Sequence, residues 1–178
     1  MIETERLILR GWRQSDHEPW AQMGRDPEVM RHFPALIDQD ESDWMIRERL
    51  QPHIERNGWG LWAVERKSDR AFLGFTGLDY VDFACPIQGE VEIGWRLARH
   101  AWGRGYAFEA ASAAAEYGFN TLGLERMVAM TVEANDRSRR LMDKLGMVRA
   151  PELDFDHPRV PEGSPQRPQI VYVLERPA

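Results

Sequence analysis

The amino-acid sequence predicts an α/β (α+β) domain in which a mixed β-sheet carries helices on both faces. The first observation is the order of the predicted elements: a strand, helices, three strands, a helix, a strand, a helix and two strands. The second is an alanine-rich run at 108–117, which is the strongest helix signal in the chain. The third is the run 125–133, which is apolar on both faces and therefore typical of a central strand. A chain of 178 residues has the size of one domain, so we expect a single domain over 1–178.

The first third of the chain is predicted to form one strand followed by helices. The short apolar run 6–10 predicts the strand. The Ser-x-x-Glu pattern at 15–18 is a capping box that opens a short helix. The Asp-Pro pair at 26–27 places a helix cap and a first-turn proline side by side, which predicts a second helix. A longer helix is expected to begin at Asp40 and to end or break near Pro52.

The middle of the chain is predicted to be a hairpin and a third strand. Two strand-like runs, 59–65 and 71–80, are separated by a polar turn, which is typical of an antiparallel hairpin. In the next run, 90–97, acidic and apolar residues alternate until Gly94. A glycine inside a strand often marks a bulge or a close approach of another molecule, so we expect a bulge at Gly94.

The second half of the chain contains two helices, each preceded by a strand. The first is the alanine-rich run. The second is capped by Asn135 or Asp136, has apolar residues at helical spacing and ends at Gly146. Three further segments follow: a strand at 147–153, a polar proline-rich stretch at 154–169 and a closing strand at 170–174.

Composition narrows the function classes. Hydrophobic residues make up 43% and charged residues 29% of the chain, and no apolar run approaches the roughly 20 residues of a membrane-spanning helix. The charged residues 1–6 do not form a secretory signal, and the single Cys85 excludes an intramolecular disulfide. The net charge of -6 disfavours a nucleic-acid-binding face, and the five histidines lack metal-ligand spacing. We therefore expect a cytoplasmic protein that binds no nucleic acid, membrane or metal.

The segment 102–107 places two glycines directly before the alanine-rich helix. Small residues let the main chain approach a ligand, and the helix start adds unpaired N–H groups, so the segment predicts a diphosphate site. A P-loop needs a lysine after its second glycine, and none is present. A dinucleotide fingerprint needs a third glycine, where Phe108 stands. The remaining candidate is a loop that binds the pyrophosphate of coenzyme A.

The segment Trp102-Gly103-Arg104-Gly105-Tyr106-Ala107 resembles the Gln/Arg-x-x-Gly-x-Gly/Ala motif of the GNAT acetyltransferase superfamily. Its first position departs from that motif, because Trp102 replaces Gln or Arg, as in the RimJ/RimL-like branch of ribosomal-protein N-terminal acetyltransferases. Similarity to that branch covers nearly the whole chain and includes the segments 4–7, 92–95, 135–138, 145–147 and 155–159. The resemblance implies a GNAT-like, mostly antiparallel sheet of about seven strands. It also implies acetyl-CoA as co-substrate and a primary amine as acceptor, either a protein N-terminus or a small molecule.

Acetyl transfer to an amine requires a group that takes the amine proton, and a carboxylate can do this. Glu90 and Glu92 share one face of their strand. Glu92 is the favoured catalytic residue because it lies beside the expected bulge, and the resemblance also favours it; the alternative is a pair of solvated carboxylates. A main-chain N–H within 94–96 would donate to the thioester oxygen as negative charge develops there.

The departing sulfur also needs a partner. Met142 stands where GNAT enzymes often have a tyrosine acid, so we assign Ser138 as the hydrogen-bond donor; its alternative role is a small packed helix residue. Asn135 would bind the pantetheine arm, cap its helix, or do both.

The resemblance and the loop together give a set of site residues. Those expected to bind acetyl-CoA are Trp95, Arg96, Leu97, Trp102, Gly103, Arg104, Gly105, Tyr106, Ala107, Asn135 and Ser138. Among the arginines that could bind the cofactor phosphates, we favour Arg104, which lies inside the loop. Arg99, Arg139 and Arg140 are weaker candidates, because exposed helix arginines are usually only solvated. Phe33, Trp59 and Tyr80, together with Trp44, are candidates for the walls of the acceptor cleft.

Two function classes remain open at this point. One is a catalytic N-acetyltransferase, monomeric or homodimeric, and the other is a non-catalytic acyl-CoA sensor or interaction module on the same fold. The presence of both Glu92 and Ser138 favours catalysis. A cysteine-based route is disfavoured because nothing near Cys85 lowers the pKa of its thiol.

Overall fold

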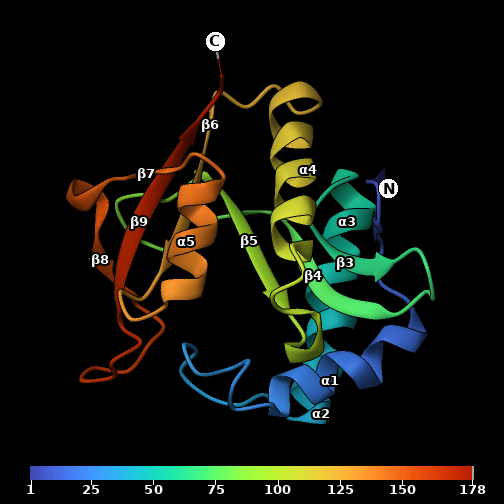
Figure 1. The fold of residues 1–178 in the computed structure, drawn as a ribbon. Coiled ribbons are helices and arrows are strands. Elements are labelled where there is room, and N and C mark those ends of the chain that lie inside the picture. Colours follow the sequence, from blue (N-terminus) through green and yellow to red (C-terminus); the bar gives the residue numbers. More distant parts are fainter. Residues whose placement is uncertain (178) are drawn as a thin grey trace.

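The computed structural model describes residues 1–177 and shows a mixed sheet with helices on both faces (Figure 1). Within that range the sheet has nine strands in the order β1-β2-β3-β4-β5-β6-β9-β7, with β8 paired to β9. The strands are β1 (Ile2–Glu3), β2 (Leu7–Arg10), β3 (Leu61–Arg66), β4 (Phe72–Tyr80), β5 (Val91–Leu97), β6 (Arg126–Thr131), β7 (Val148–Arg149), β8 (Phe155–Asp156) and β9 (Pro168–Glu175). The predicted fold class is confirmed. The expected count of about seven is low because β1 and β8 have only two residues each and leave no hydrophobic pattern in the sequence.

The helices cover the two faces of the sheet. They are α1 (His17–Arg25), α2 (Gln39–Trp44), α3 (Gln51–Asn57), α4 (Tyr106–Asn120) and α5 (Asp136–Lys144). On β3, Trp62 and Val64 belong to a core cluster with Ala110 of α4, whereas Ala63 between them packs in a second cluster with Trp20 of α1. Side chains alternate across a strand, so α4 and α1 lie on opposite faces. None of the helices in residues 1–177 is both long and apolar enough to cross a membrane.

The sheet opens between β5 and β6. These neighbours run parallel, whereas every other neighbouring pair described in residues 1–177 is antiparallel. They pair at Glu92 and Val128, near the start of both strands, and then separate (Figure 1). The later part of β5 therefore has β4 on one side and an opening on the other.

Two of the predicted helix starts are wrong. The α1 helix begins at His17 without a Ser15 cap, because the carboxylate of Asp16 instead holds Arg10 at 2.7 Å and accepts the main-chain N–H of Arg13. The Asp26 side chain accepts the N–H of Glu28 in a turn that follows α1, and no helix or strand occurs between Arg25 and Gln39. Ser15 therefore caps no helix, and the N–H bond that Asp26 accepts closes a turn without starting a helix.

The longer helix predicted from Asp40 is confirmed, but it continues beyond Pro52. Asp38 caps α2 by accepting the N–H of Glu41 at 2.9 Å. A π-helical stretch, Met45–Leu50, then precedes α3, in whose first turn Pro52 lies. Proline lacks the N–H that an α-helix interior requires, and the first turn of a helix tolerates that loss.

Apart from the missed β1 and β8, the strands differ from prediction in two places. The bulge expected at Gly94 is absent, because β4 and β5 pair in continuous register and Gly94 lies opposite Gly77. The irregularity of β5 is instead its separation from β6. The strand expected over 147–153 is reduced to β7, which a 3-10 turn at Pro151–Leu153 follows.

Candidate active site

A glycine turn leads from β5 into α4. The 3-10 turn Arg99–Ala101 is followed by Gly103 and Gly105, whose φ angles of 70° and 80° are in the left-handed region that glycine adopts without strain. No side chain caps α4, and its first main-chain bond runs from the Glu109 N–H to the Gly105 carbonyl. The N–H groups of residues 106–108 therefore point out of the helix end with its positive dipole, which is an arrangement that binds phosphate.

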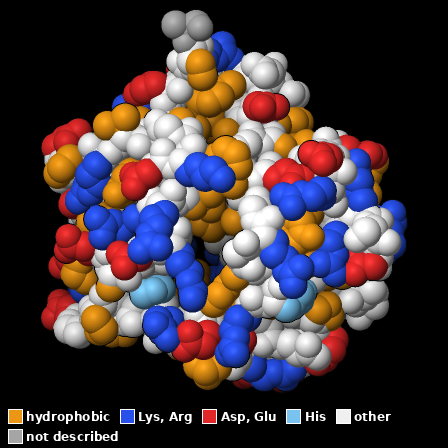
Figure 2. All heavy atoms as spheres, in the orientation of Figure 1, with side chains coloured by type: hydrophobic (Ala, Val, Ile, Leu, Met, Phe, Trp, Pro, Cys, Tyr) orange, Lys and Arg blue, Asp and Glu red, His pale blue; other side chains and the backbone are white. Residues whose placement is uncertain are grey.

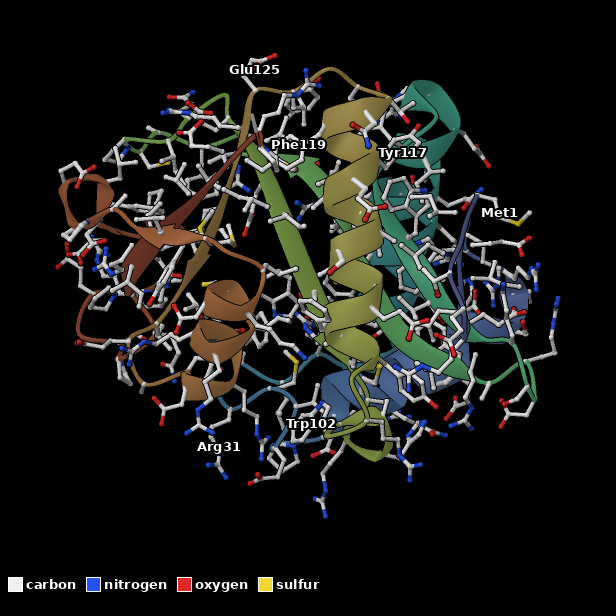
Figure 3. All side chains as sticks on the ribbon, turned by 45° about the horizontal axis from the view of Figure 1, so that its top comes forward. Met1, Arg31, Trp102, Tyr117, Phe119 and Glu125 are labelled. Atoms are coloured by element: carbon white, nitrogen blue, oxygen red, sulfur yellow. The ribbon has the colours of Figure 1, made fainter. Side chains whose placement is uncertain are left out.

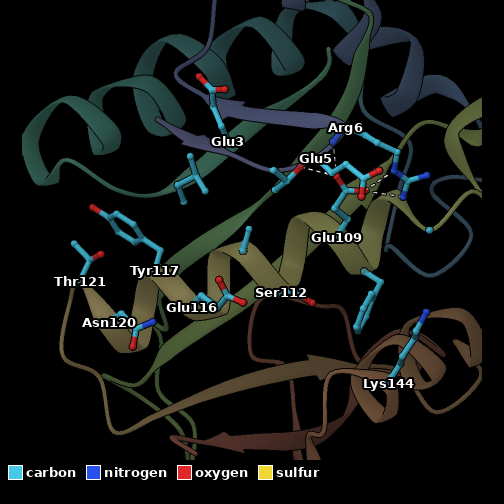
Figure 4. Close-up of a pocket in the computed structure, with 15 residues that line it drawn as sticks. Glu3, Glu5, Arg6, Glu109, Ser112, Glu116, Tyr117, Asn120, Thr121 and Lys144 are labelled. Carbon is cyan, nitrogen blue, oxygen red and sulfur yellow. Dashed lines mark hydrogen bonds and ion pairs between the residues drawn. The ribbon is translucent and has the colours of Figure 1, made fainter. Parts of the chain in front are cut away.

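The N-terminal segment holds this turn in place. Arg6 donates from Nη1 to the carbonyl of Arg104 at 3.0 Å and from Nε to Glu109 at 2.6 Å. Thr4 also donates to the Glu109 carboxylate, and Figure 4 shows Arg6 directed toward Glu109. The resemblance at 4–7 thus has a physical basis, because this segment fixes the first turn of α4.

The open edge of β5 presents main-chain groups to the gap. Ala98 donates its N–H to Leu73 of β4 at 2.8 Å, and main-chain groups alternate in direction along a strand. The main-chain N–H and C=O groups of Trp95 and Leu97 consequently point away from β4. The indole Nε1 of Trp102 bonds the Leu97 carbonyl from that side at 2.8 Å. The Trp95 N–H is left facing the opening.

A first cavity of about 880 Å³, which we call the donor cavity, extends from this opening along the glycine turn and α5. Arg137, Arg140 and Lys144 line it from α5, and Arg31 lines it from the loop after α1. The Arg137 guanidinium lies 4.1 Å from the ring centre of Trp102. Arg31 and Trp102 are at the end of the molecule where α4 begins (Figure 3). Figure 2 shows Lys and Arg side chains gathered around a hollow in this face, so the donor cavity suits a polyanion.

The structure places all but one of the expected cofactor residues in the donor cavity. The exception is Arg104, whose side chain is exposed and absent from the cavity wall. Arg140 lines the donor cavity, whereas Arg99 lines a separate hollow and Arg139 donates to the Glu133 carbonyl. Sequence reasoning missed Arg137 and Lys144. Their spacing from Arg140, three residues before and four after, would have indicated a single cationic face of α5.

A second cavity of about 570 Å³, the acceptor cavity, lies on the other side of β5. Residues of α2, β4, β5 and the 157–169 tail line it, among them Glu92 and Tyr80, together with Phe33 of the loop between α1 and α2. The two cavities share His32, Phe33, Trp95, Arg96, Asn135 and Ser138. They therefore meet at one place, which we call the junction.

Glu92 has the most perturbed carboxyl of the acceptor cavity. Burial and, to a smaller extent, the charge of Asp79 raise the pKa of Glu92 to about 8, although Arg49 acts in the opposite direction. Asp79 is the cross-strand neighbour of Glu92 on β4, and Arg49 pairs with Asp79 at 3.1 Å. Glu90, the alternative to Glu92, instead forms an ion pair with Arg126 outside the cavity. The structure thus separates the two carboxylates that the sequence placed on one face.

Asn135 and Ser138 lie at the junction with defined partners. Asn135 caps α5 by accepting the Ser138 N–H at 3.3 Å, and its Nδ2 donates to Thr131 at 3.0 Å. The Ser138 hydroxyl oxygen accepts the Trp95 indole N–H at 3.2 Å, which leaves its own proton available to donate. Met142, in the position expected for a tyrosine acid, is buried at 1% exposure.

Two of the four predicted acceptor-wall residues line the acceptor cavity and two do not. Phe33 and Tyr80 line it, whereas Trp59 is buried in the core with its ring centre 5.1 Å from that of Tyr80 and 5.3 Å from His53. Trp59 therefore supports Tyr80 from behind. Trp44 is 54% exposed and lines neither cavity.

A sheet that opens between two parallel strands, with an uncapped helix behind a glycine turn at its mouth, is suited to bind a ligand that carries phosphate. A model of the Acetyltransferase (GNAT) domain matches residues 6–148, and the chain belongs to this family of acetyltransferases. GNAT acetyltransferases use acetyl-CoA and act on amines, so this chain is an acetyltransferase.

The chain is also similar to individual proteins from bacteria. The Bacillus subtilis protein YkkB is 34% identical over 148 residues, which cover 82% of this chain and 84% of YkkB. The GNAT-family acetyltransferase of Bacillus anthracis superposes with a TM-score of 0.75 at 25% identity, covering 98% of this chain and 97% of that one. The spermidine N-acetyltransferase of Vibrio cholerae, in complex with CoA and spermine, gives a TM-score of 0.73 at 17% identity, covering 97% and 96%, and shares the fold.

Proposed function

We propose that this acetyltransferase moves an acetyl group from acetyl-CoA directly to a primary amine, on a peptide N-terminus or a small molecule, while both are bound. The observation that carries the proposal is the junction. One cavity reaches it from the glycine turn of α4, and the other reaches it from Glu92. Cys85 packs instead beside Val81 and Phe83 in an apolar cluster, so it is not placed to hold the acetyl group in between.

The residues of the donor cavity fit acetyl-CoA. Three outward N–H groups at residues 106–108 suit the diphosphate, and Arg137, Arg140 and Lys144 add positive charge. The open edge at Trp95 and Leu97 can pair with the amides of the pantetheine arm. When bound, acetyl-CoA supplies a thioester carbon that the amine attacks, with the C–S bond breaking as the N–C bond forms.

In this mechanism Glu92 takes the proton of the amine. A carboxyl with a pKa near 8 is matched to an α-amine, whose ordinary pKa is about 7.7–8.0, and less so to a lysine side chain at about 10.4. A cationic ammonium beside Glu92 favours the carboxylate, and proton transfer then leaves a neutral acid and a neutral, nucleophilic amine. This match supports a peptide N-terminus or another weakly basic amine as acceptor.

At the junction, two donors act on the reacting thioester. The Trp95 N–H faces the opening and stabilises the thioester oxygen as its negative charge grows. The Ser138 hydroxyl donates to the departing sulfur. Because the Trp95 indole already fills one lone pair of the Ser138 oxygen, the hydroxyl proton is oriented away from that indole.

We further assign the chain to the RimJ/RimL-like branch, as a monomer or homodimer. The support is Trp102, the residue by which the loop departs from the general motif. Its ring packs on Arg137 and its indole N–H bonds Leu97, so it fastens the glycine turn to β5 where other members have Gln or Arg.

A panel assay tests the proposal against the sensor alternative. The protein is incubated with acetyl-CoA and N-terminal peptides, polyamines or aminoglycosides, and thiol release is followed. We expect acceptor-dependent release from wild type and Glu90→Gln, and about a hundredfold less from Glu92→Gln. Calorimetric binding of acetyl-CoA without acceptor-dependent release across the panel would instead favour a non-catalytic sensor.

A further inference from the structure

Arg96 is a half-buried cation, and no carboxylate of the described residues pairs with it. Its guanidinium carbon lies 3.8 Å from the ring centre of Phe33, 5.2 Å from Trp20 and 5.7 Å from Phe75. Its Nε and Nη1 atoms are buried and have no hydrogen-bond partner. Burial lowers the pKa of Arg96 to about 10, so the side chain stays charged at neutral pH. Aromatic faces compensate only part of the lost hydration of such a cation.

The other cations of the acceptor cavity are neutralised. Arg49 pairs with Asp79 at 3.1 Å, and Arg159 pairs with Asp82 at 3.1 Å. Burial lowers the pKa of the two histidines that line the acceptor cavity, His32 and His157, and nearby arginines lower it further. Within residues 1–177, Arg96 is thus the arginine of this cavity that has no anionic partner.

The strand surface between Glu92 and Arg96 is bare. These two residues and Gly94 face the same side of β5, and the Cα atoms of Glu92 and Arg96 are roughly 13 Å apart on an extended strand. A Cβ atom at Gly94 would meet only Leu61, at 3.9 Å. An acceptor can therefore lie over Gly94 and reach the carboxyl at one end and the guanidinium at the other.

We propose that the acceptor carries a carboxylate, which Arg96 binds while the amine lies beside Glu92. This rests on the proposed function and names its substrate class: free amino acids, or peptides with a nearby acidic side chain. A guanidinium presents parallel N–H groups that match the two oxygens of a carboxylate. The donor cavity has its own cations in Arg137, Arg140 and Lys144, so the cofactor phosphates do not require Arg96.

The test compares matched acceptors. Thiol release is measured with amino acids and their amides, and with peptides that have Glu or Gln at the second position. We expect wild type to prefer the acid over its neutral partner at least about tenfold in kcat/KM, and Arg96→Gln to lose that preference. Arg159→Gln, which removes a paired cation from the same cavity, should keep it. Whichever acid–neutral pair shows the preference identifies the source of the carboxylate.

Two results would overturn the inference while leaving the enzyme assignment intact. One is turnover by wild type without preference for the acid in any pair. The other is an Arg96→Gln variant that binds acetyl-CoA more than about tenfold more weakly but keeps the acid preference, which would assign Arg96 to the donor. If Arg96→Gln does not fold, Arg96→Lys, which keeps charge but not the planar fork, should lower the preference severalfold.

A binding measurement keeps the two proposals separate. Calorimetry in the presence of coenzyme A compares the amino acid with its amide and needs no turnover. Tighter binding of the acid to wild type, but not to Arg96→Gln, supports the carboxylate site even if no thiol is released. Equal binding of acid and amide to wild type counts against it, and absence of thiol release alone counts only against the proposed reaction.

Discussion

Glu92→Gln exchanges an enclosed carboxyl for an uncharged amide of nearly the same size. In the folded protein, burial and then Asp79 raise the pKa of Glu92 from its ordinary 4.5 to about 8, while Arg49 acts in the opposite direction. At about 1.36 kcal/mol for each pH unit between those two values, an ionised Glu92 destabilises the fold by at most about 5 kcal/mol. The glutamine variant lacks this penalty at every pH.

The direction in which the stability difference between wild type and Glu92→Gln changes with pH follows from proton binding. Below pH 4.5 both the folded and unfolded states hold the Glu92 proton, so Glu92 does not destabilise the wild type. As pH rises toward 8 the unfolded chain releases that proton while the folded chain keeps it, and wild type loses stability relative to Glu92→Gln. Above pH 8 the difference stays constant. For a chain of this size it corresponds to roughly 10–20 °C in Tm at full extent.

Urea and thermal unfolding at pH 5, 7 and 9 measure this difference. Glu90→Gln is the matched control, because it removes a carboxylate beside the same strand that is held in an ion pair outside the cavity. We expect the stability gain of Glu92→Gln over wild type to grow from pH 5 to pH 9. A gain that is the same at all three values would refute the argument that burial perturbs Glu92.

Four further predictions concern the two cavities. Gly105→Glu should abolish acetyl-CoA binding in calorimetry, because a side chain strains this left-handed position and its Cβ would lie 3.3 Å from Nη2 of Arg6, which holds the turn, whereas Gly123→Glu, at a similar φ with open space around it, should bind normally. Ser138→Ala should lower kcat at least about tenfold with little change in acetyl-CoA affinity; an unchanged kcat would leave Ser138 a packing role. Trp95→Phe, which removes the indole donor to Ser138 and keeps a smaller aromatic ring, should reduce kcat less than Ser138→Ala does. Gly94→Leu should raise the KM of the amine while acetyl-CoA still binds, and an unchanged KM would place the acceptor elsewhere.

The parts of the fold that the sequence predicts well are those determined by local chemistry. The alanine-rich α4, the glycine turn before it and the Asn135 cap of α5 all follow from residues adjacent in the chain. The central position of β6 follows from its two apolar faces, and it lies between β5 and β9. Most of the predicted cofactor residues reach one cavity for the same reason, since they are consecutive around one strand and one turn.

The parts that the sequence does not predict depend on distant partners. Asp16 gives its carboxylate to Arg10, so the capping pattern beside it fails. Gly94 differs from an ordinary strand residue because β6 departs, which no local pattern of β5 encodes. Trp59 and Tyr80 are both aromatic, so the sequence does not distinguish them. Only the packing places Tyr80 at the acceptor cavity and Trp59 behind it in the core.

The contacts of Arg6 bear on how the protein should be handled in the laboratory. Removing the first six residues would withdraw a brace from the glycine turn and the first turn of α4, whose contacts with Arg6 are 98 and 103 residues away in the chain. An affinity tag that pulls on this end would loosen the same brace. Cofactor affinity measured on such material would then report the tag as much as the enzyme.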